Sequence, residues 1–359
     1  DEMQRHAEYG FIPAGFIDDD PAKQETSVSG IPVVGTRADI PRAIQDLAID
    51  ELLIALPSVS GSAVRAIIRY CETERVRFRV VPGIWSIIRG DVHIQEIRPV
   101  KAEDLLGRET VELDLNLITG AYAGKRLLVT GAGGSIGSEI CRQLLLANPE
   151  KLVVVGRGEN SVFEAGLSFR EQFPDAPLDV VIGDVRDPLL VNEIFRRHRP
   201  HAVFHAAAHK HVWLMEINPE EAVANNVLAT AGLIDAAIRH GAERFVLIST
   251  DKAVNPRSVM GATKRLAELY LLERAAGLSD GDTRLMAVRF GNVLGSRGSV
   301  VPVFQRQIAA GGPVTVSHPE VARYFMTVRE AALLVVEAGA LGQGGEIFIL
   351  DMGEQVPIV

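Results

Sequence analysis

The chain has few cysteines and no long hydrophobic run, and each shortage excludes a class of protein. Its 359 residues include two cysteines, Cys71 and Cys141, which lie too far apart to suggest a disulfide framework or a metal site. We therefore expect no bound metal and a reducing, cytoplasmic compartment. No stretch approaches the roughly 20 apolar residues of a membrane span, and no signal peptide opens the chain. This part of the protein is therefore expected to be soluble.

Basic and aromatic residues are also scarce. The 37 Lys and Arg residues are outnumbered by 46 Asp and Glu residues, which gives a net charge of -9. Aromatic residues make up 6% of the chain, and none are interleaved with a basic run as in many nucleic-acid-binding proteins. The composition argues against a nucleic-acid partner and favours a small molecule. With 47% hydrophobic residues, the chain can form two globular domains.

Apolar runs that alternate with helical patterns predict that both domains are α/β. In residues 1–100, apolar runs at 52–56 and 78–81 flank a helical pattern at 62–74, the order of a small Rossmann-like domain. Residues 1–9 resemble the end of a helix, so we expect the first strand of this domain to lie upstream. A charged, irregular segment at 101–123 predicts a linker.

The second domain, residues 124–359, shows the stronger alternation. Its predicted strands lie at 126–130, 152–155, 179–182, 202–205 and 244–249. Its clearest predicted helices lie at 138–146 and 225–240. Several strands separated by helices predict a doubly wound parallel sheet, the Rossmann fold.

A glycine-rich turn follows the first strand of this domain. It supplies six predicted cofactor-binding residues: Gly131, Gly133, Gly134, Ser135, Ile136 and Gly137. Glycines at this spacing allow a tight turn and a close approach to a pyrophosphate, which then faces a helix N-terminus. A purely structural turn is the alternative, and the surrounding strand and helix disfavour it. The turn therefore predicts a nicotinamide dinucleotide cofactor.

The end of the second strand bears on the choice between NAD and NADP. An acidic residue that holds the adenosine ribose is expected about 20 residues after the turn, but Gly156 and Arg157 stand there. A guanidinium attracts a 2′-phosphate, which favours NADP. In the alternative, Arg157 is a surface residue and Glu159 holds the ribose of NAD. Further predicted cofactor residues follow the third and fourth strands: Asp184, Val185, Ala206 and Ala207.

Polar residues at the end of strand 244–249 are candidates for catalysis. Thr250, Asp251 and Lys252 follow this strand, at the sheet edge where ligands bind. Met260 and Lys264 lie four residues apart on a helical pattern, so they share one face. Short-chain dehydrogenases carry Tyr and Lys in these two positions, and Met cannot transfer a proton. Either the three strand-end residues perform the acid-base chemistry or the domain is inactive; a capped turn and a solvated lysine are the structural alternatives.

Five segments make the resemblance to one family specific. They are His-Lys-His-Val at 209–212, Ser-Thr-Asp-Lys-Ala-Val-Asn-Pro at 249–256, Met-Gly-Ala-Thr-Lys-Arg at 260–265, Arg-Phe-Gly-Asn-Val at 289–293 and Gly-Ser-Val-Val-Pro at 298–302. The chain resembles the polysaccharide-biosynthesis branch of the extended short-chain dehydrogenases, which includes UDP-N-acetylglucosamine 4,6-dehydratases. The first domain resembles the CoA-binding-like module of long members. The resemblance implies a homo-oligomer with upstream membrane helices, anchored to the inner membrane with this part facing the cytoplasm.

The resemblance also implies a role for each strand-end residue. Thr250 would hold the sugar O4, Asp251 would protonate the departing C6 hydroxyl, and Lys252 would remove the C5 proton. Met260 would occupy the Tyr position, as in the configuration-retaining subgroup. In this lyase reaction the hydride taken from C4 returns to C6, so a recycled and tightly bound cofactor is expected.

Three further residues are candidate ligands of the nucleotide sugar, here a UDP-N-acetylhexosamine. Asn292 and Arg323 are matched directly, with the arginine facing the diphosphate, and Lys210 is expected to line the same cleft. Each could instead make a local contact within the fold. The chain departs from the family pattern at Trp213, where Pro is usual, and at Gly156, and it ends before a family Arg-Pro-Gly-Glu segment that normally completes the substrate lobe. We therefore expect a C-terminally truncated catalytic domain.

Two other functions remain open at this stage. A UDP-sugar 4-epimerase uses the same fold and cofactor, but it needs no group that expels the C6 hydroxyl. A non-catalytic dinucleotide sensor would need no acid-base residues at all. Asp251 and Lys252 therefore favour dehydration over both alternatives.

Overall fold

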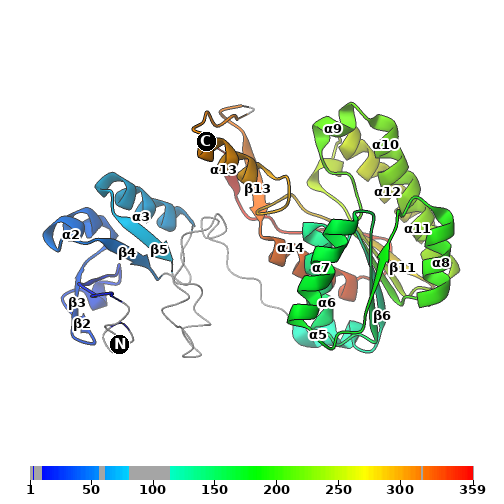
Figure 1. Ribbon diagram of the computed structural model, residues 1–359, viewed down its shortest axis with the longest axis horizontal. Helices are drawn as coiled ribbons and strands as arrows, with labels where there is room; N and C mark the ends of the chain where they lie inside the picture. Colours follow the sequence, from blue (N-terminus) through cyan, green and yellow to red (C-terminus); the bar gives the residue numbers. More distant parts are fainter. Residues whose placement is uncertain (1–2, 4–9, 56–60, 81–113, 317, 359) are drawn as a thin grey trace. The chain divides into compact units, whose positions relative to one another are not determined.

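The chain divides into two compact units, residues 1–109 and 110–359. The computed structural model describes residue 3 and residues 10–55, 61–80, 114–316 and 318–358 (Figure 1). The helix end expected at residues 1–9, apart from residue 3, and residues 101–113 of the expected linker lie outside the described residues. The rest of the linker prediction was wrong, because residues Leu115–Tyr122 form a helix, α5, whose Ile118 and Tyr122 are buried in the core of the second unit. In the part of the chain that is described, no helix combines the length and apolar character needed to cross a membrane.

The first unit is a small α/β structure. Its strands are β1 (Phe16–Ile17), β2 (Ser27–Val28), β3 (Ile31–Gly35), β4 (Glu51–Ile54) and β5 (Arg77–Val80). Its helices are η2 (Pro21–Lys23), η3 (Arg37–Asp39), α2 (Ile40–Asp46) and α3 (Gly61–Glu74). β4 and β5 pair in parallel. Ile40 and Ile44 of α2, and Ile67 and Cys71 of α3, are buried together, because residues four apart share one helix face. The expected α/β class of this unit is confirmed.

The second unit contains a seven-stranded sheet. Its strands are β6 (Arg126–Thr130), β7 (Lys151–Gly156), β8 (Leu178–Ile182), β9 (Ala202–His205), β10 (Arg244–Ile248), β11 (Arg284–Arg289) and β14 (Glu346–Ile349). Their spatial order is β14-β11-β10-β9-β6-β7-β8, and every neighbouring pair is parallel. The predicted Rossmann sheet is therefore confirmed. Because the chain winds in opposite directions from β6, the carboxyl ends of β6 and β9 flank a crevice suited to a ligand.

Helices cover both faces of this sheet (Figure 1). One layer comprises α5 (Leu115–Tyr122), α6 (Ser135–Leu145), α7 (Glu159–Gln172) and α14 (Val328–Leu341). The other comprises α8 (Pro188–His198), α11 (Ala229–Arg239) and α12 (Val259–Ala276). Leu127 and Val129 pack into the first layer and Leu128 into the second, because successive strand side chains point to opposite faces. Burial on both faces explains why β6 is apolar almost throughout.

The remaining elements extend the carboxyl edge of the sheet. They are α9 (Val212–Glu216), α10 (Pro219–Val223), the π-helix η6 (Ala224–Leu228), the short turn η7 (Asp251–Ala253), β12 (Asn292–Val293), α13 (Val300–Ala309), β13 (Ala322–Met326) and β15 (Gln355–Pro357). β12, β13 and β15 form a small separate sheet. We call this sheet, together with α13, the C-terminal lobe.

Two predicted helix boundaries were wrong. Helix α6 starts at Ser135 and not at 138, because Gly137 packs inside its first turn, where any Cβ would clash with the Gly131 carbonyl. The helix expected over 225–240 opens with the π-helix η6. Asn225 and Asn226 lie in this wider turn and are both buried, a conformation that is often found at functional sites.

Candidate functional site

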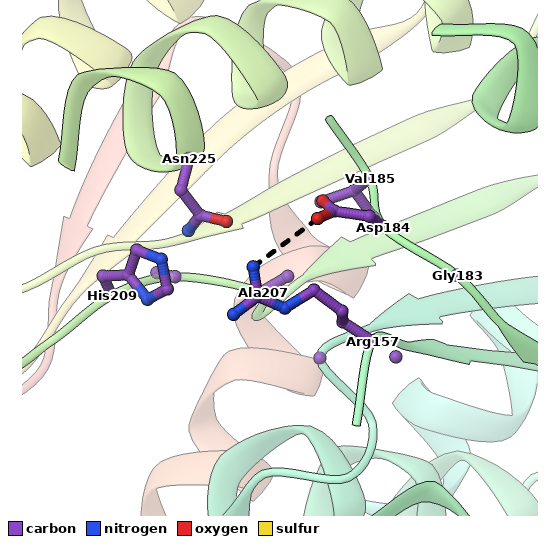
Figure 2. A pocket seen from close by; sticks show the side chains of 10 residues that line it. Arg157, Gly183, Asp184, Val185, Ala207, His209 and Asn225 are labelled. Atoms are coloured by element: carbon purple, nitrogen blue, oxygen red, sulfur yellow. Dashed lines mark ion pairs between the residues drawn. The ribbon is translucent and has the colours of Figure 1, made fainter. Parts of the chain in front are cut away.

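A pocket lies at the carboxyl ends of four adjacent strands, β6 to β9. It is lined by Gly131, Gly156, Arg157, Gly183, Asp184, Val185, Ala207, Ala208, His209 and Asn225. Figure 2 shows the Arg157 side chain extending toward Asp184, with Asn225 and His209 nearby. Five of the predicted cofactor residues line this pocket: Gly131, Arg157, Asp184, Val185 and Ala207. The pocket therefore coincides with the crevice that the strand order creates.

The glycine turn fits a bound diphosphate. Gly131 has φ of +68°, and a Cβ there would lie 2.6 Å from the Ala207 backbone nitrogen. A Cβ at Gly133 would lie 2.6 Å from the Ser161 hydroxyl, so only glycine lets the turn pack this closely. Ser135 is the first residue of α6, and the first N–H groups of a helix lack partners within it. Such N–H groups and the helix dipole favour an anion at this turn.

Arg157 and Asp184, which line the pocket, belong to a cluster of two arginines and two carboxylates. Arg186 donates hydrogen bonds to both oxygens of Asp184 and both of Glu221, at distances of 2.6 to 3.0 Å. The hydrogen bonds from Arg186 lower the pKa of Asp184 to about 2. The Arg157 guanidinium lies 3.5 Å from Asp184 and 3.8 Å from Glu221, and its side chain is 57% exposed. Arg157 is thus the accessible cation of this group.

Other predicted cofactor residues lie around the pocket without lining it. Glu159 begins α7 and is exposed. The Ala206 N–H donates to the Thr130 carbonyl. At Gly156, a Cβ would lie 2.6 Å from a Val162 methyl carbon, so packing against α7 explains why no carboxylate stands at the end of β7.

Thr250, Asp251, Lys252 and Asn292 form one hydrogen-bonded cluster. Lys252 Nζ lies 2.8 Å from Asp251 Oδ1 and 3.2 Å from Asn292 Oδ1. The Thr250 hydroxyl donates to Asp251 Oδ1 at 3.0 Å and accepts from the Lys252 N–H. The strand end is thus a capped turn, which was the structural alternative to a catalytic role. It also holds a possible acid, Asp251, beside a possible base, Lys252. β10 and β11 are neighbours, which brings Asn292 to residues some 40 positions earlier.

The other predicted substrate residues bond elsewhere. Lys210 Nζ donates to the Arg297 carbonyl at 2.8 Å, and the Arg323 guanidinium donates to the adjacent Ala322 carbonyl. Trp213 lies on α9 with 66% of its surface exposed. Among the described substrate candidates, Asn292 is therefore the one that hydrogen bonds join to the Thr250 cluster.

Met260 and Lys264 are both buried on α12. Met260 packs with Met215 and Ala222. Lys264 is 4% exposed, and its Nζ donates to the Ile248 carbonyl at 2.6 Å. Burial lowers the pKa of Lys264 to about 8, and the nearby Glu268 carboxylate opposes this shift. The alternative of a solvated lysine is therefore wrong.

The pH dependence of stability should report this burial. Below pH 8, Lys264 is charged in both the folded and the unfolded chain, and its buried charge destabilises the folded chain. Between the folded pKa of about 8 and the ordinary value of 10.5, Lys264 is neutral in the folded chain but still charged in the unfolded chain, so the folded chain becomes more stable as the pH rises. We expect the free energy of unfolding of the unaltered protein, relative to Lys264→Met, to rise from about pH 7 to about pH 10. Urea denaturation at both pH values measures the difference. A difference that is independent of pH would contradict the prediction.

Sequence reasoning missed two buried polar groups that support the site. Glu268 is fully buried and accepts hydrogen bonds from Ser249, Arg289 and Arg265. His205 lies between the hydroxyls of Thr130 and Thr230 at 2.7 and 2.9 Å, and burial lowers its pKa to about 3. The signal for Glu268 was its spacing of four residues from Lys264, which places both on one face of α12.

Comparison with known proteins identifies the family. Residues 127–359 match the family described as "Polysaccharide biosynthesis protein", which is more than half of the chain. The chain belongs to the polysaccharide biosynthesis protein family. Residues 1–82 match the family described as "CoA-binding domain". The suspected resemblance is therefore confirmed at the family level.

Family relatives are similar over most of the chain. The probable polysaccharide biosynthesis protein EpsC of Bacillus subtilis (strain 168) is 48% identical over 349 residues, 97% of this chain and 58% of that protein. The capsular polysaccharide biosynthesis protein CapD of Staphylococcus aureus is 46% identical over 363 residues, 100% of this chain and 60% of that protein. The uncharacterized membrane protein MJ1061 of Methanocaldococcus jannaschii is 46% identical over 235 residues, 66% of this chain and 69% of that protein. The chain spans about three fifths of the length of EpsC and CapD.

Solved structures of similar proteins match about two thirds of the chain. Pen from Bacillus thuringiensis has a TM-score of 0.63 at 35% identity, covering 66% of this chain and 72% of that one. The dTDP-glucose 4,6-dehydratase DesIV of Streptomyces venezuelae, with NAD and TYD bound, has a TM-score of 0.58 at 26% identity, covering 65% and 77%. The UDP-glucose 4-epimerase of Thermus thermophilus, in complex with NAD, has a TM-score of 0.54 at 25% identity, covering 65% and 78%. The extended short-chain dehydrogenase fold is therefore confirmed.

Proposed function

We propose that the protein is a nucleotide-sugar 4,6-dehydratase that converts UDP-N-acetylglucosamine to its 4-keto-6-deoxy product. The observation that carries the proposal is the hydrogen-bonded cluster of Thr250, Asp251, Lys252 and Asn292 at neighbouring strand ends. Met260 occupies the position of the tyrosine in short-chain dehydrogenases, and a methionine cannot transfer a proton. Acid-base work therefore falls to the cluster. The dehydratase DesIV among the similar structures supports the reaction class.

In this proposal each member of the cluster acts at one atom of the sugar. The Thr250 hydroxyl holds O4. The Lys252 amine takes the C5 proton from the 4-keto sugar, and Asp251 protonates the C6 oxygen, which leaves as water while the C5–C6 double bond forms. When the hydride returns to C6, the Lys252 ammonium gives a proton back to C5. Asp251, whose Oδ1 lies 2.8 Å from Lys252 Nζ, regains its proton from solvent, in place of the proton that O4 released on oxidation. Asn292 accepts a hydrogen bond from Lys252 and orients its amine.

In our proposal the cofactor binds in the pocket at the carboxyl ends of β6 to β9. Strand β10, which leads into Thr250, pairs with β9. A dinucleotide bound in the pocket would accept hydride from C4 and return it to C6, chemistry that side chains cannot supply. In our proposal the glycine turn holds the diphosphate, Asp184 and Val185 face the adenine, Ala206 and Ala207 line the path toward the nicotinamide, and buried Lys264 faces the nicotinamide ribose. Lys210 and Arg323 remain proposed ligands of the sugar nucleotide.

Incubation of the full-length protein with UDP-N-acetylglucosamine tests the proposed reaction. We expect a product lighter by roughly 18 mass units, one water, detected by mass spectrometry. An isobaric product would instead indicate the second candidate, a UDP-sugar 4-epimerase, which the similarity to the Thermus thermophilus epimerase favours. Cofactor binding without turnover would point to a dinucleotide sensor.

We further propose NADP as the cofactor, with NAD as the alternative. Arg157 is 57% exposed at the pocket, and Gly156 leaves the end of β7 without a carboxylate that would repel a 2′-phosphate. Asp184 and Glu221 partly offset the Arg157 charge. If instead Glu159 holds a ribose hydroxyl, NAD is expected. The NAD-bound similar structures are consistent with either dinucleotide in the same fold.

Arg157→Ala should separate the two cofactors. We expect the affinity for NADP to fall about tenfold, the effect of one charge-assisted hydrogen bond, while the affinity for NAD changes little. Isothermal titration with each dinucleotide measures both affinities, and Arg170→Ala at the exposed end of α7 is the matched control. Tighter binding of NAD than NADP by the unaltered protein would contradict the proposal.

For the whole protein we propose a membrane-anchored homo-oligomer. Residues 1–100 would form the CoA-binding-like module, and the linker would end before residue 114, because α5 (Leu115–Tyr122) packs into the core of the second unit. The rest of the chain to residue 359 would form the catalytic domain facing the cytoplasm. The relative named as a membrane protein, MJ1061, supports an anchor. Fractionation of cells that express the full-length protein tests this, because recovery in the supernatant would contradict anchoring.

A further inference from the structure

A loop of the C-terminal lobe crosses the glycine turn. Residues 294–299, which we call the strap, connect β12 to α13. The backbone N–H of Arg297 donates to the Ser135 hydroxyl at 3.0 Å, and its guanidinium donates to the Gly133 carbonyl at 3.3 Å. A second guanidinium nitrogen lies 2.9 Å from a carboxylate oxygen of Glu164 on α7. One residue thus reaches the turn, more than 160 positions earlier in the chain, and the helix α7, 133 positions earlier.

The strap is held at its base and along one side. Leu294 is buried, with 5% of its surface exposed. The Arg297 carbonyl accepts a hydrogen bond from Lys210 Nζ at 2.8 Å. Gly298 has φ of +70°, and a Cβ there would lie 2.8 Å from the ring of His211. The loop after β9 therefore packs directly against the strap and directs Arg297 toward the glycine turn.

The guanidinium of Arg297 is held by weak bonds in this structure. Its side chain is 63% exposed, as is that of Glu164, and an exposed ion pair contributes little to stability. The bond to the Gly133 carbonyl involves a neutral acceptor at 3.3 Å. Phosphate oxygens accept stronger, charge-assisted bonds from the arginine fork. A diphosphate at the N-terminus of α6 would therefore compete favourably for this guanidinium.

We propose that Arg297 binds the diphosphate of the dinucleotide and that the strap slows its release. This inference rests on the proposed dinucleotide site and adds a ligand from a distant lobe to it. Slow release matches a reaction in which hydride is stored and returned within one turnover. The strap also connects the proposed cofactor site to the Thr250 cluster, because its first residue, Leu294, lies two positions after Asn292.

The rate of dinucleotide release tests the proposal. The full-length protein and Arg297→Gln are loaded with NADPH or NADH, and the loss of bound-state fluorescence is followed after excess oxidised dinucleotide is added. We expect Arg297→Gln to release the reduced dinucleotide about tenfold faster, as for the loss of a charge-assisted bond. Arg297→Lys, which keeps the charge without the fork, should fall between the two. Release should accelerate with salt in the unaltered protein more than in Arg297→Gln.

Arg306→Gln is the matched control, because Arg306 is exposed on α13 next to the strap. Its release rate should stay within about twofold of the unaltered protein. Equal rates for Arg297→Gln and Arg306→Gln would overturn the proposal, as would an effect confined to the binding of UDP-N-acetylglucosamine. If the unaltered protein binds neither dinucleotide, the proposed function itself fails. If it binds one and Arg297→Gln releases it at the same rate, the strap alone is refuted.

Discussion

Lys252→Met is expected to slow conversion of UDP-N-acetylglucosamine by about 10² to 10⁴-fold, the usual contribution of a positioned general base. Methionine matches the length of the lysine stem but takes no proton. The substitution also removes the partner of Asp251 at 2.8 Å and of Asn292 at 3.2 Å. Product formation, measured by mass spectrometry, gives the rate. Lys125→Met is the control, because Lys125 forms an exposed ion pair with Glu243 away from the cluster.

Isotope exchange separates the roles of Lys252 and Asp251. In deuterated water, a base that takes the C5 proton reversibly exchanges it with solvent. We expect Lys252→Met to lose both this exchange and water elimination. Asp251→Asn should retain exchange at C5 while product formation falls by a similar factor, because the C6 oxygen then lacks its acid. Exchange that persists in Lys252→Met would assign the base elsewhere.

The parts of the site that the sequence predicts are local in the chain. The glycine turn occupies seven consecutive residues, and its function depends on backbone freedom that only glycine supplies. Thr250, Asp251 and Lys252 are adjacent and follow an apolar strand, so their place at a sheet edge follows from the strand pattern. The parallel, doubly wound arrangement of the five predicted strands could also be expected, because alternating strands and helices in one domain favour such a sheet. Strands β11 and β14 were not among the predicted strands.

Contacts between distant segments could not be predicted in the same way. Arg297 meets Gly133 because the loop after β12 folds back over the first strand end, and no local pattern specifies that path. The start of α6 was missed because Gly137, typical of a turn, is needed inside the helix for its close approach to Gly131. Residue roles at Lys210 and Arg323 depend on a bound sugar nucleotide and stay predictions.

Glu268→Ala is expected to lower the free energy of unfolding by about 3–5 kcal/mol, the cost of leaving buried charges without their partner. The Glu268 side chain is 0% exposed, and those of Arg289 and Arg265 are 11% and 36% exposed. Both arginines donate to its carboxylate, and so does the Ser249 hydroxyl. Urea denaturation near neutral pH measures the loss. Glu193→Ala is the matched control, because Glu193 pairs with Arg196 on the exposed face of α8, and loss of an exposed ion pair should change the free energy of unfolding little.

The contribution of Glu268 to the free energy of unfolding should decrease at low pH. Burial raises the pKa of Glu268, but hydrogen bonds from Arg289, Ser249 and Arg265 outweigh it, so the pKa lies below the ordinary 4.5. A carboxylate with a lowered pKa stabilises the folded chain above the unfolded value and loses that contribution as pH falls below it. The difference in free energy of unfolding between the unaltered protein and Glu268→Gln should therefore become smaller below about pH 4.5. A difference that is constant across this range, or one no larger than for Glu193→Ala, would contradict the prediction.

The same carboxylate connects stability to the proposed chemistry. Ser249 immediately precedes Thr250, and Arg289 ends β11 three residues before Asn292. Glu268 thus binds the ends of β10 and β11 through Ser249 and Arg289, and the residues that follow these ends form the Thr250 cluster. If this binding positions the cluster, Glu268→Gln should lower turnover under conditions where the variant is still fully folded, with little change in dinucleotide affinity. Unchanged turnover in the folded variant would restrict Glu268 to stability, because the Lys252–Asp251 contact would then hold without it.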